Sequence, residues 1–193
     1  MEFLIGFATG LALVAPVGPV VLTLFGLGAE QGRRAALAGA GGVIAADTVT
    51  MPIALGSAGV VAGVDTGIVR HVEVVMGLAL VVVAVLTMAR AEAARTAIGS
   101  MRRPARTLAA MTMCNPLSLV AWSGLALALP ASISTPRSLA VFGAGLVAAS
   151  AVWHLGIAAA SGALASRLTV GTRTWLTRGS GVMMLGIAVV LVA

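Results

Sequence analysis

Long apolar stretches alternate with short arginine-bearing segments along the whole chain. A helix needs about 20 apolar residues to cross the hydrocarbon core of a bilayer. Six stretches are long enough, at residues 3–28, 35–63, 72–89, 108–130, 139–163 and 175–193. They lack the short alternating segments typical of membrane β-strands, so the pattern predicts an all-α membrane protein with six transmembrane helices.

The composition agrees with this pattern and bounds the domain organisation. Apolar residues make up 60% of the chain and charged residues 9%, against about 25% charged in a soluble domain. A water-soluble fold is therefore excluded. We expect one polytopic domain over residues 1–193, with a three-helix half at 1–89, a cytoplasmic loop at 90–107 and a second half at 108–193.

Arginines predict the orientation of the helices. The chain has no lysine, and its 12 basic residues are all arginines placed between apolar stretches. Ten of the 12 fall in the first, third and fifth loops. Because positive residues favour the cytoplasmic side, both termini are expected outside the cytoplasm. The same placement argues for topology signals and against a nucleic-acid partner.

Three helices per half is an odd number, so halves of the same fold would have opposite orientations. Inverted repeats of this kind are common in secondary transporters. Ala45, Ala46 and Asp47 in the second stretch have an echo in Ala148-Ala149-Ser150 in the fifth. We predict a 3+3 inverted repeat, with chance similarity between alanine-rich segments as the alternative.

Two apolar stretches carry proline steps. The first contains Pro16, Gly18 and Pro19, and the fourth contains Asn115 followed by Pro116. Proline removes a backbone hydrogen bond and collides with the carbonyl four residues earlier, so each helix should kink or open. Freed backbone groups are tolerated in a membrane only inside protein or beside a wet cavity. Broken helices in both halves point to a substrate site, although single prolines are often structural.

Asp47 is the one carboxylate well inside an apolar stretch. Because a charged Asp at a helix centre costs about 2.5–3.5 kcal/mol, its side chain should face the bundle interior. There it can bind a substrate ammonium group or carry a proton; capping the broken backbone of the first helix is the alternative. His154, in the opposite half, is a second candidate for proton coupling. It can also simply hydrogen-bond Ser150, four residues earlier.

Other chemistry has little support. No His, Cys, Asp or Glu cluster has metal-ligand spacing, no glycine-rich phosphate loop with its lysine is present, and nothing around Ser150 resembles a nucleophile turn. We therefore expect no metal site, no cofactor and no enzyme activity. Gly6 and Gly10 form a small-residue motif that predicts a helix contact face, within the chain or in a homodimer.

Together these features resemble the LysE family of amino-acid exporters. The resemblance rests on the order of the Pro-x-Gly-Pro step, the Gly-Arg-Arg-Ala run at 32–35, the Asp in the second helix, the Asn-Pro in the fourth and Trp153 in the fifth. It implies a bacterial inner-membrane exporter of amino acids or related small molecules, driven by proton antiport. By position it implies a substrate site made of Pro16, Gly18, Pro19, Asp47, Asn115 and Pro116.

One departure bears on the cargo, and two other functions stay open. Family members usually have a polar residue after the Gly-Pro, whereas Val20 and Val21 follow here, which leaves room for a more apolar cargo. A divalent-metal exporter of the same superfamily is one alternative, although one Asp, one His and one Cys make a poor ligand set. A non-transporting accessory membrane subunit is the other.

Overall fold

The computed structural model describes residues 1–15, 18–61, 66–89, 98–115 and 135–165, with isolated positions between 118 and 133 and between 175 and 189. Within this part of the chain the regular structure is helical and contains no strand. Six helices have described bounds: α1 Glu2–Val14, α2 Pro19–Glu30, α3 Arg33–Val61, α4 Thr66–Ala89, α6 Pro104–Met113 and α8 Pro136–Ala165.

These six helices do not correspond one to one with the six predicted stretches. The first stretch is divided into α1 and α2, while α3, α4 and α8 correspond to the second, third and fifth. The fourth begins as α6 at Pro104, earlier than predicted, because proline is favoured in the first turn of a helix. Most of the sixth lies outside the described residues.

Apolar length supports a membrane location for this fold. Two described segments, Arg33–Gly56 and Pro136–Ala163, are long and apolar enough to cross a bilayer by themselves. Glu2–Val14, Val20–Glu30 and Gly77–Leu86 are shorter apolar helices. Exposed aliphatic residues on these helices, such as Ile53, Val82 and Val152, then face lipid.

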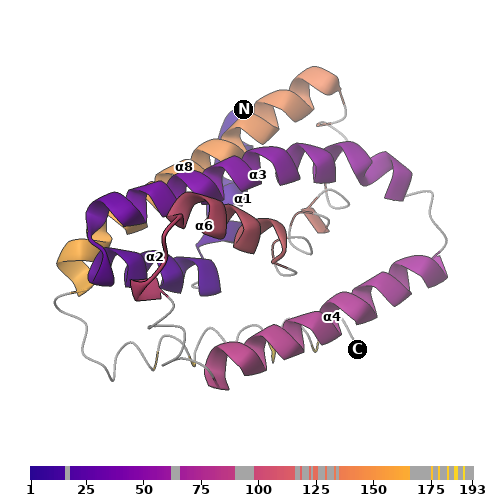
Figure 1. Ribbon diagram of the computed structural model, residues 1–193. Coiled ribbons are helices and arrows are strands. Elements are labelled where there is room, and N and C mark those ends of the chain that lie inside the picture. Colours follow the sequence, from indigo (N-terminus) through magenta and orange to yellow (C-terminus); the bar gives the residue numbers. More distant parts are fainter. Residues whose placement is uncertain are drawn as a thin grey trace.

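Helix α8 packs against α1, α2 and α3, and α6 lies along α3, as the ribbon shows (Figure 1). The α1–α8 contact depends on glycine. A Cβ on Gly6 would collide with the carbonyl oxygen of Phe142, and one on Gly10 would meet Leu146 and Ala149. The predicted contact face is thus confirmed, and its partner is a helix of the other half of the same chain.

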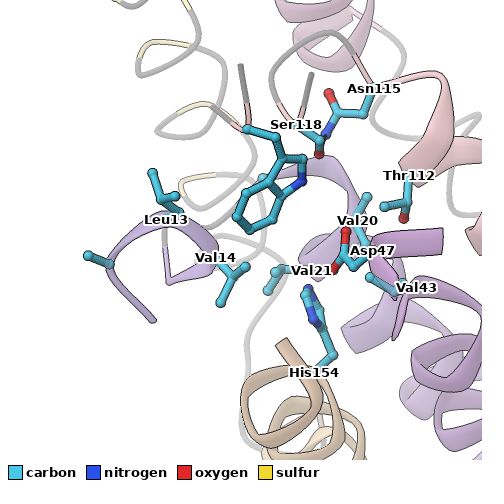
Figure 2. Close-up of a pocket in the computed structure, with 13 residues that line it drawn as sticks. Leu13, Val14, Val20, Val21, Val43, Asp47, Thr112, Asn115, Ser118 and His154 are labelled. Carbon is cyan, nitrogen blue, oxygen red and sulfur yellow. Dashed lines mark hydrogen bonds between the residues drawn. The ribbon is translucent and has the colours of Figure 1, made fainter. Parts of the chain in front are cut away.

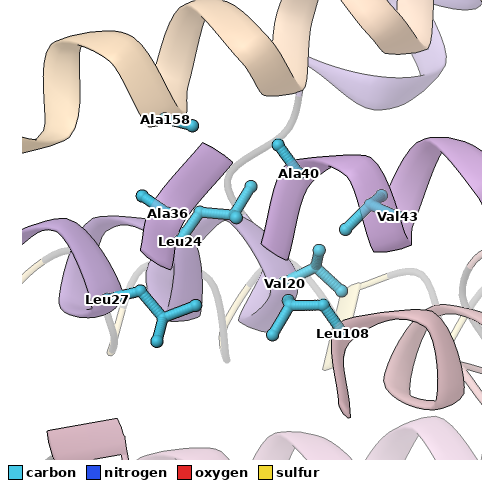
Figure 3. Packing of buried hydrophobic residues seen from close by; sticks show 8 residues of the cluster. All are labelled: Val20, Leu24, Leu27, Ala36, Ala40, Val43, Leu108 and Ala158. Atoms are coloured by element: carbon cyan, nitrogen blue, oxygen red, sulfur yellow. The ribbon is translucent and has the colours of Figure 1, made fainter. Parts of the chain in front are cut away.

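Apolar residues from α2, α3, α6 and α8 form a buried cluster (Figure 3). The cluster consists of Val20, Leu24, Leu27, Ala36, Ala40, Val43, Leu108 and Ala158. A second cluster includes Met51, Trp122, Phe142 and Leu146.

Between α2 and α3 the chain turns at Gly32, whose φ of 85° is a conformation that other residues rarely adopt.

Candidate functional site

The first predicted helix is interrupted at its proline step. Helix α1 ends at Val14, and the amide of Ala15 makes its last bond, to the carbonyl of Leu11 at 2.9 Å. Gly18 then has extended backbone, and Pro19 begins α2 at a position that suits proline because the first helical N–H has no partner in any case. The first bond of α2 runs from Leu22 N to Gly18 O at 3.1 Å. The amides of Val20 and Val21 precede that bond, so they have no acceptor inside the helix.

The fourth predicted helix also ends at its Asn-Pro step. Helix α6 runs to Met113, and Asn115 follows it in non-helical backbone. A residue before proline is disfavoured in helical conformation, which explains the end of α6 here. The Asn115 amide nitrogen donates to the Ser118 hydroxyl at 3.1 Å.

A cavity of about 190 Å³ lies where these two interruptions meet α3 and α8. Figure 2 shows Asp47, Asn115, His154 and the two valines that follow Pro19 in α2 around it. Its lining residues are Ala12, Leu13, Val14, Gly18, Val20, Val21, Val43, Asp47, Thr112, Asn115, Ser118, Trp122 and His154.

The polar side chains of the cavity sit in stripes that are otherwise apolar. Asp47 occupies the α3 face between buried Val43 and Met51, four residues on either side. On α8, Ser150 and His154 lie between buried Leu146 and Ala158, again at intervals of four. Side chains at this spacing share one helix face. The faces that pack the bundle therefore also bring these polar groups inward.

Asp47, Ser150 and His154 form one hydrogen-bonded chain between the two halves. The Ser150 hydroxyl donates to Asp47 Oδ2 at 2.6 Å, and His154 Nδ1 lies 3.2 Å from the same hydroxyl oxygen. All three residues are buried, with Asp47 3% exposed, Ser150 0% and His154 5%. The carboxylate is thus bound by the second half of the chain. Among the described residues it makes no contact that caps the interrupted backbone.

The contacts also assign the proton on neutral His154. Nδ1 lies 2.9 Å from the carbonyl oxygen of Ser150, which can only accept a hydrogen bond. The Ser150 hydroxyl hydrogen is already given to Asp47, so its oxygen can only accept from Nδ1 as well. Nδ1 therefore carries the hydrogen, and Nε2 keeps its lone pair.

The sequence-predicted residues divide into two groups. The cavity brings together Gly18, Asp47, Asn115 and His154. Pro19 is the first residue of α2, with its side chain outside the described atoms. The other two predicted residues, Pro16 and Pro116, lie outside the described residues.

Among the residues at the site that the sequence does not predict as members are Ser150 and Trp122. The sequence predicts Ser150 only as a partner of His154. Its place in an apolar stripe at intervals of four also indicates that its side chain faces the interior of the bundle. Trp122 lines the cavity and is 4% exposed, and its indole nitrogen has no hydrogen-bond partner among the described residues. Nothing in the sequence near Trp122 distinguishes it from a packing residue.

Comparison with known proteins gives one match. The family model for the LysE type translocator covers residues 11–193, which is nearly the whole chain. No curated protein and no solved structure shows significant similarity to this sequence.

Proposed function

Because the chain belongs to the LysE type translocator family, whose members move solutes across membranes, we propose that it exports amino acids or related small molecules by exchange with protons. The observation that carries this proposal is the cavity in which Asp47, the α1–α2 interruption and His154 meet. Of the described acids, Asp47 is the one in the cavity lining, so it is the natural group to receive a cation.

The substrate would bind between opposite charges. Amides at the start of α2 that have no acceptor within the helix, with the positive end of the helix dipole, suit a carboxylate. Asp47 suits an ammonium group or a proton. Interrupted helices around a binding site are a recurrent arrangement in secondary transporters, where the site lies near the middle of the bilayer.

The chain of hydrogen bonds offers a route for the exchanged proton. A proton taken up at His154 Nε2 leaves hydrogens on both ring nitrogens. The Nδ1 hydrogen can pass to the Ser150 oxygen while the Ser150 hydrogen passes to Asp47 Oδ2, a relay over contacts of 3.2 and 2.6 Å. Proton binding at Asp47 would then compete with binding of a substrate ammonium group, which is the coupling that an antiporter needs.

The two halves support this mechanism through their contact. Asp47 and Ser150, the positions that echo each other in sequence, are hydrogen-bonded, and their neighbours Ala46 and Ala149 are both buried. Residues near the axis of a two-fold repeat are expected to meet in this way. We therefore keep the 3+3 inverted repeat in the proposal, together with an inner-membrane location and both termini outside the cytoplasm.

Counterflow in proteoliposomes tests the function. Vesicles holding the purified chain and one unlabelled amino acid are diluted into the labelled compound, and divalent cations are tested in parallel at two pH values. We expect amino-acid counterflow that Asp47→Asn abolishes while the protein still inserts. Metal-stimulated flux would favour the divalent-metal exporter, and flux of neither kind would favour the accessory subunit.

A further inference from the structure

Aliphatic side chains make up much of the cavity wall. Six small or branched apolar side chains contribute to it, namely Ala12, Leu13, Val14, Val20, Val21 and Val43. Its volume of about 190 Å³ somewhat exceeds the roughly 150 Å³ of an engineered apolar cavity that takes up benzene. A small molecule with a compact apolar part would fit it.

The charges around the cavity limit the net charge of that molecule. Among the described residues of the lining the one carboxylate is Asp47, which already accepts a hydrogen bond from Ser150. No arginine belongs to this described lining, and the chain has no lysine. A second cationic group on the ligand would therefore lack a counter-charge in a membrane interior, and an anionic group has only N–H donors to bind it. This balance favours a ligand with one ammonium and one carboxylate group.

Residues of the cavity wall carry two kinds of N–H donor that a ligand could use. The amides of Val20 and Val21 have no acceptor within α2. Independently, the indole nitrogen of Trp122 is buried with no partner among the described residues. Buried N–H groups are nearly always paired in folded proteins. Because all three residues line the same cavity, an oxygen acceptor supplied by the ligand is the group that would pair with them.

We infer that the site selects a small zwitterionic amino acid with an aliphatic side chain, and that Trp122 is one of its substrate-binding residues. The inference rests on the proposed function and narrows its substrate class. The carboxylate binds the Trp122 indole N–H and the first amides of α2, and Asp47 receives the ammonium group. The aliphatic side chain lies against Val14 and Val43.

Competition on the wild-type protein tests the substrate class without any variant. Proteoliposomes are assayed for counterflow of labelled leucine with valine, lysine or glutamate as competitor. We expect valine to compete, and the two charged amino acids to compete at least about tenfold more weakly. A tenfold difference in affinity requires only a modest difference in binding free energy. Competition by lysine equal to that by valine would overturn the inference and leave transport standing. Absence of counterflow for every amino acid would remove the proposed function and the inference with it.

A pair of matched variants tests Trp122. Trp122→Phe keeps an aromatic ring and removes the N–H; we expect the half-saturating leucine concentration to rise about tenfold with little change in maximal rate. Trp153→Phe is the control, because the Trp153 indole nitrogen is also buried without a described partner but the residue is not in the cavity lining. Equal half-saturating concentrations in the two variants would exclude Trp122.

An amine without a carboxylate separates binding from packing. Inhibition of leucine counterflow by 3-methylbutylamine, which has the same branched chain and ammonium group, is measured in wild type and Trp122→Phe. We expect the inhibition constant to stay within about twofold, because the lost N–H has no carboxylate to bind. A tenfold rise for the amine as well would show a packing defect and overturn the assignment of Trp122.

Discussion

The hydrogen bond between Asp47 and Ser150 should stabilise the contact between α3 and α8. Its length of 2.6 Å is at the short end of the range for a hydroxyl that donates to an oxygen acceptor. Bonds to charged groups contribute about 1.5–3 kcal/mol, whereas bonds between membrane helices average about 0.6 and reach about 1.7 kcal/mol. The overlap of these ranges predicts a coupling energy of about 1.5 kcal/mol between the two side chains.

A double-mutant cycle measures this coupling. Asp47→Ala, Ser150→Ala and the double variant are unfolded from detergent micelles with a denaturing detergent, and the free energy of unfolding is compared across the cycle, because alanine at either position removes the hydrogen bond. Ser161 supplies the matched control, because it is equally buried on α8 but its hydroxyl bonds only the carbonyl of Ala158 at 2.7 Å. A cycle of Asp47→Ala with Ser161→Ala should show coupling below about 0.5 kcal/mol.

The refuting result is specific. If the Asp47–Ser150 coupling is no larger than that of the control cycle, the carboxylate is not held by the second half of the chain. The proton route through Ser150 would then lose its basis, even if Asp47→Asn still stopped transport.

Three further predictions concern packing, the central loop and the histidine. Gly6→Leu should lower the free energy of unfolding by about 2 kcal/mol or more through overpacking, while Gly156→Leu, where an added Cβ meets nothing within 4 Å, should change it little in a detergent unfolding titration. Gln31→Met should remove the bonds of 2.6 and 3.1 Å from the Gln31 amide to the carbonyls of Ile98 and Met101; we expect faster hydrogen exchange at 98–101, and unchanged exchange would show that the side chain does not hold this segment. His154→Gln should flatten the pH dependence of transport, and an unmoved pH profile would leave His154 a structural residue.

Local chemistry predicts some of this fold. Pro19 specifies the start of α2 because it lacks an N–H, and Pro104 carries the same signal for α6, where hydropathy alone placed the start too late. The buried position of Asp47 follows from the cost of exposing a carboxylate to lipid. Each of these expectations depends on one residue and its immediate surroundings.

The same local reasoning does not predict which helices pack against each other. The glycines of α1 predict a close contact, yet only the packed structure gives α8 as the partner. Ser150 as the donor to Asp47 depends on that packing, because the two residues are 103 positions apart in the chain. Trp122 likewise enters the cavity through tertiary contacts that no local pattern records.

Transport driven by a pH gradient tests proton coupling at Asp47 most directly. Proteoliposomes loaded with labelled leucine are given an inward proton gradient, and leucine efflux and internal pH are recorded together for wild type, Asp47→Asn and the control Glu2→Gln, which makes the same chemical change at the start of α1. In wild type and Glu2→Gln, we expect the proton gradient to accelerate leucine efflux and the internal pH to fall as the leucine leaves. In Asp47→Asn, we expect neither faster efflux nor a fall in internal pH. Gradient-driven leucine efflux that persists in Asp47→Asn would contradict a role for this buried carboxylate in coupling.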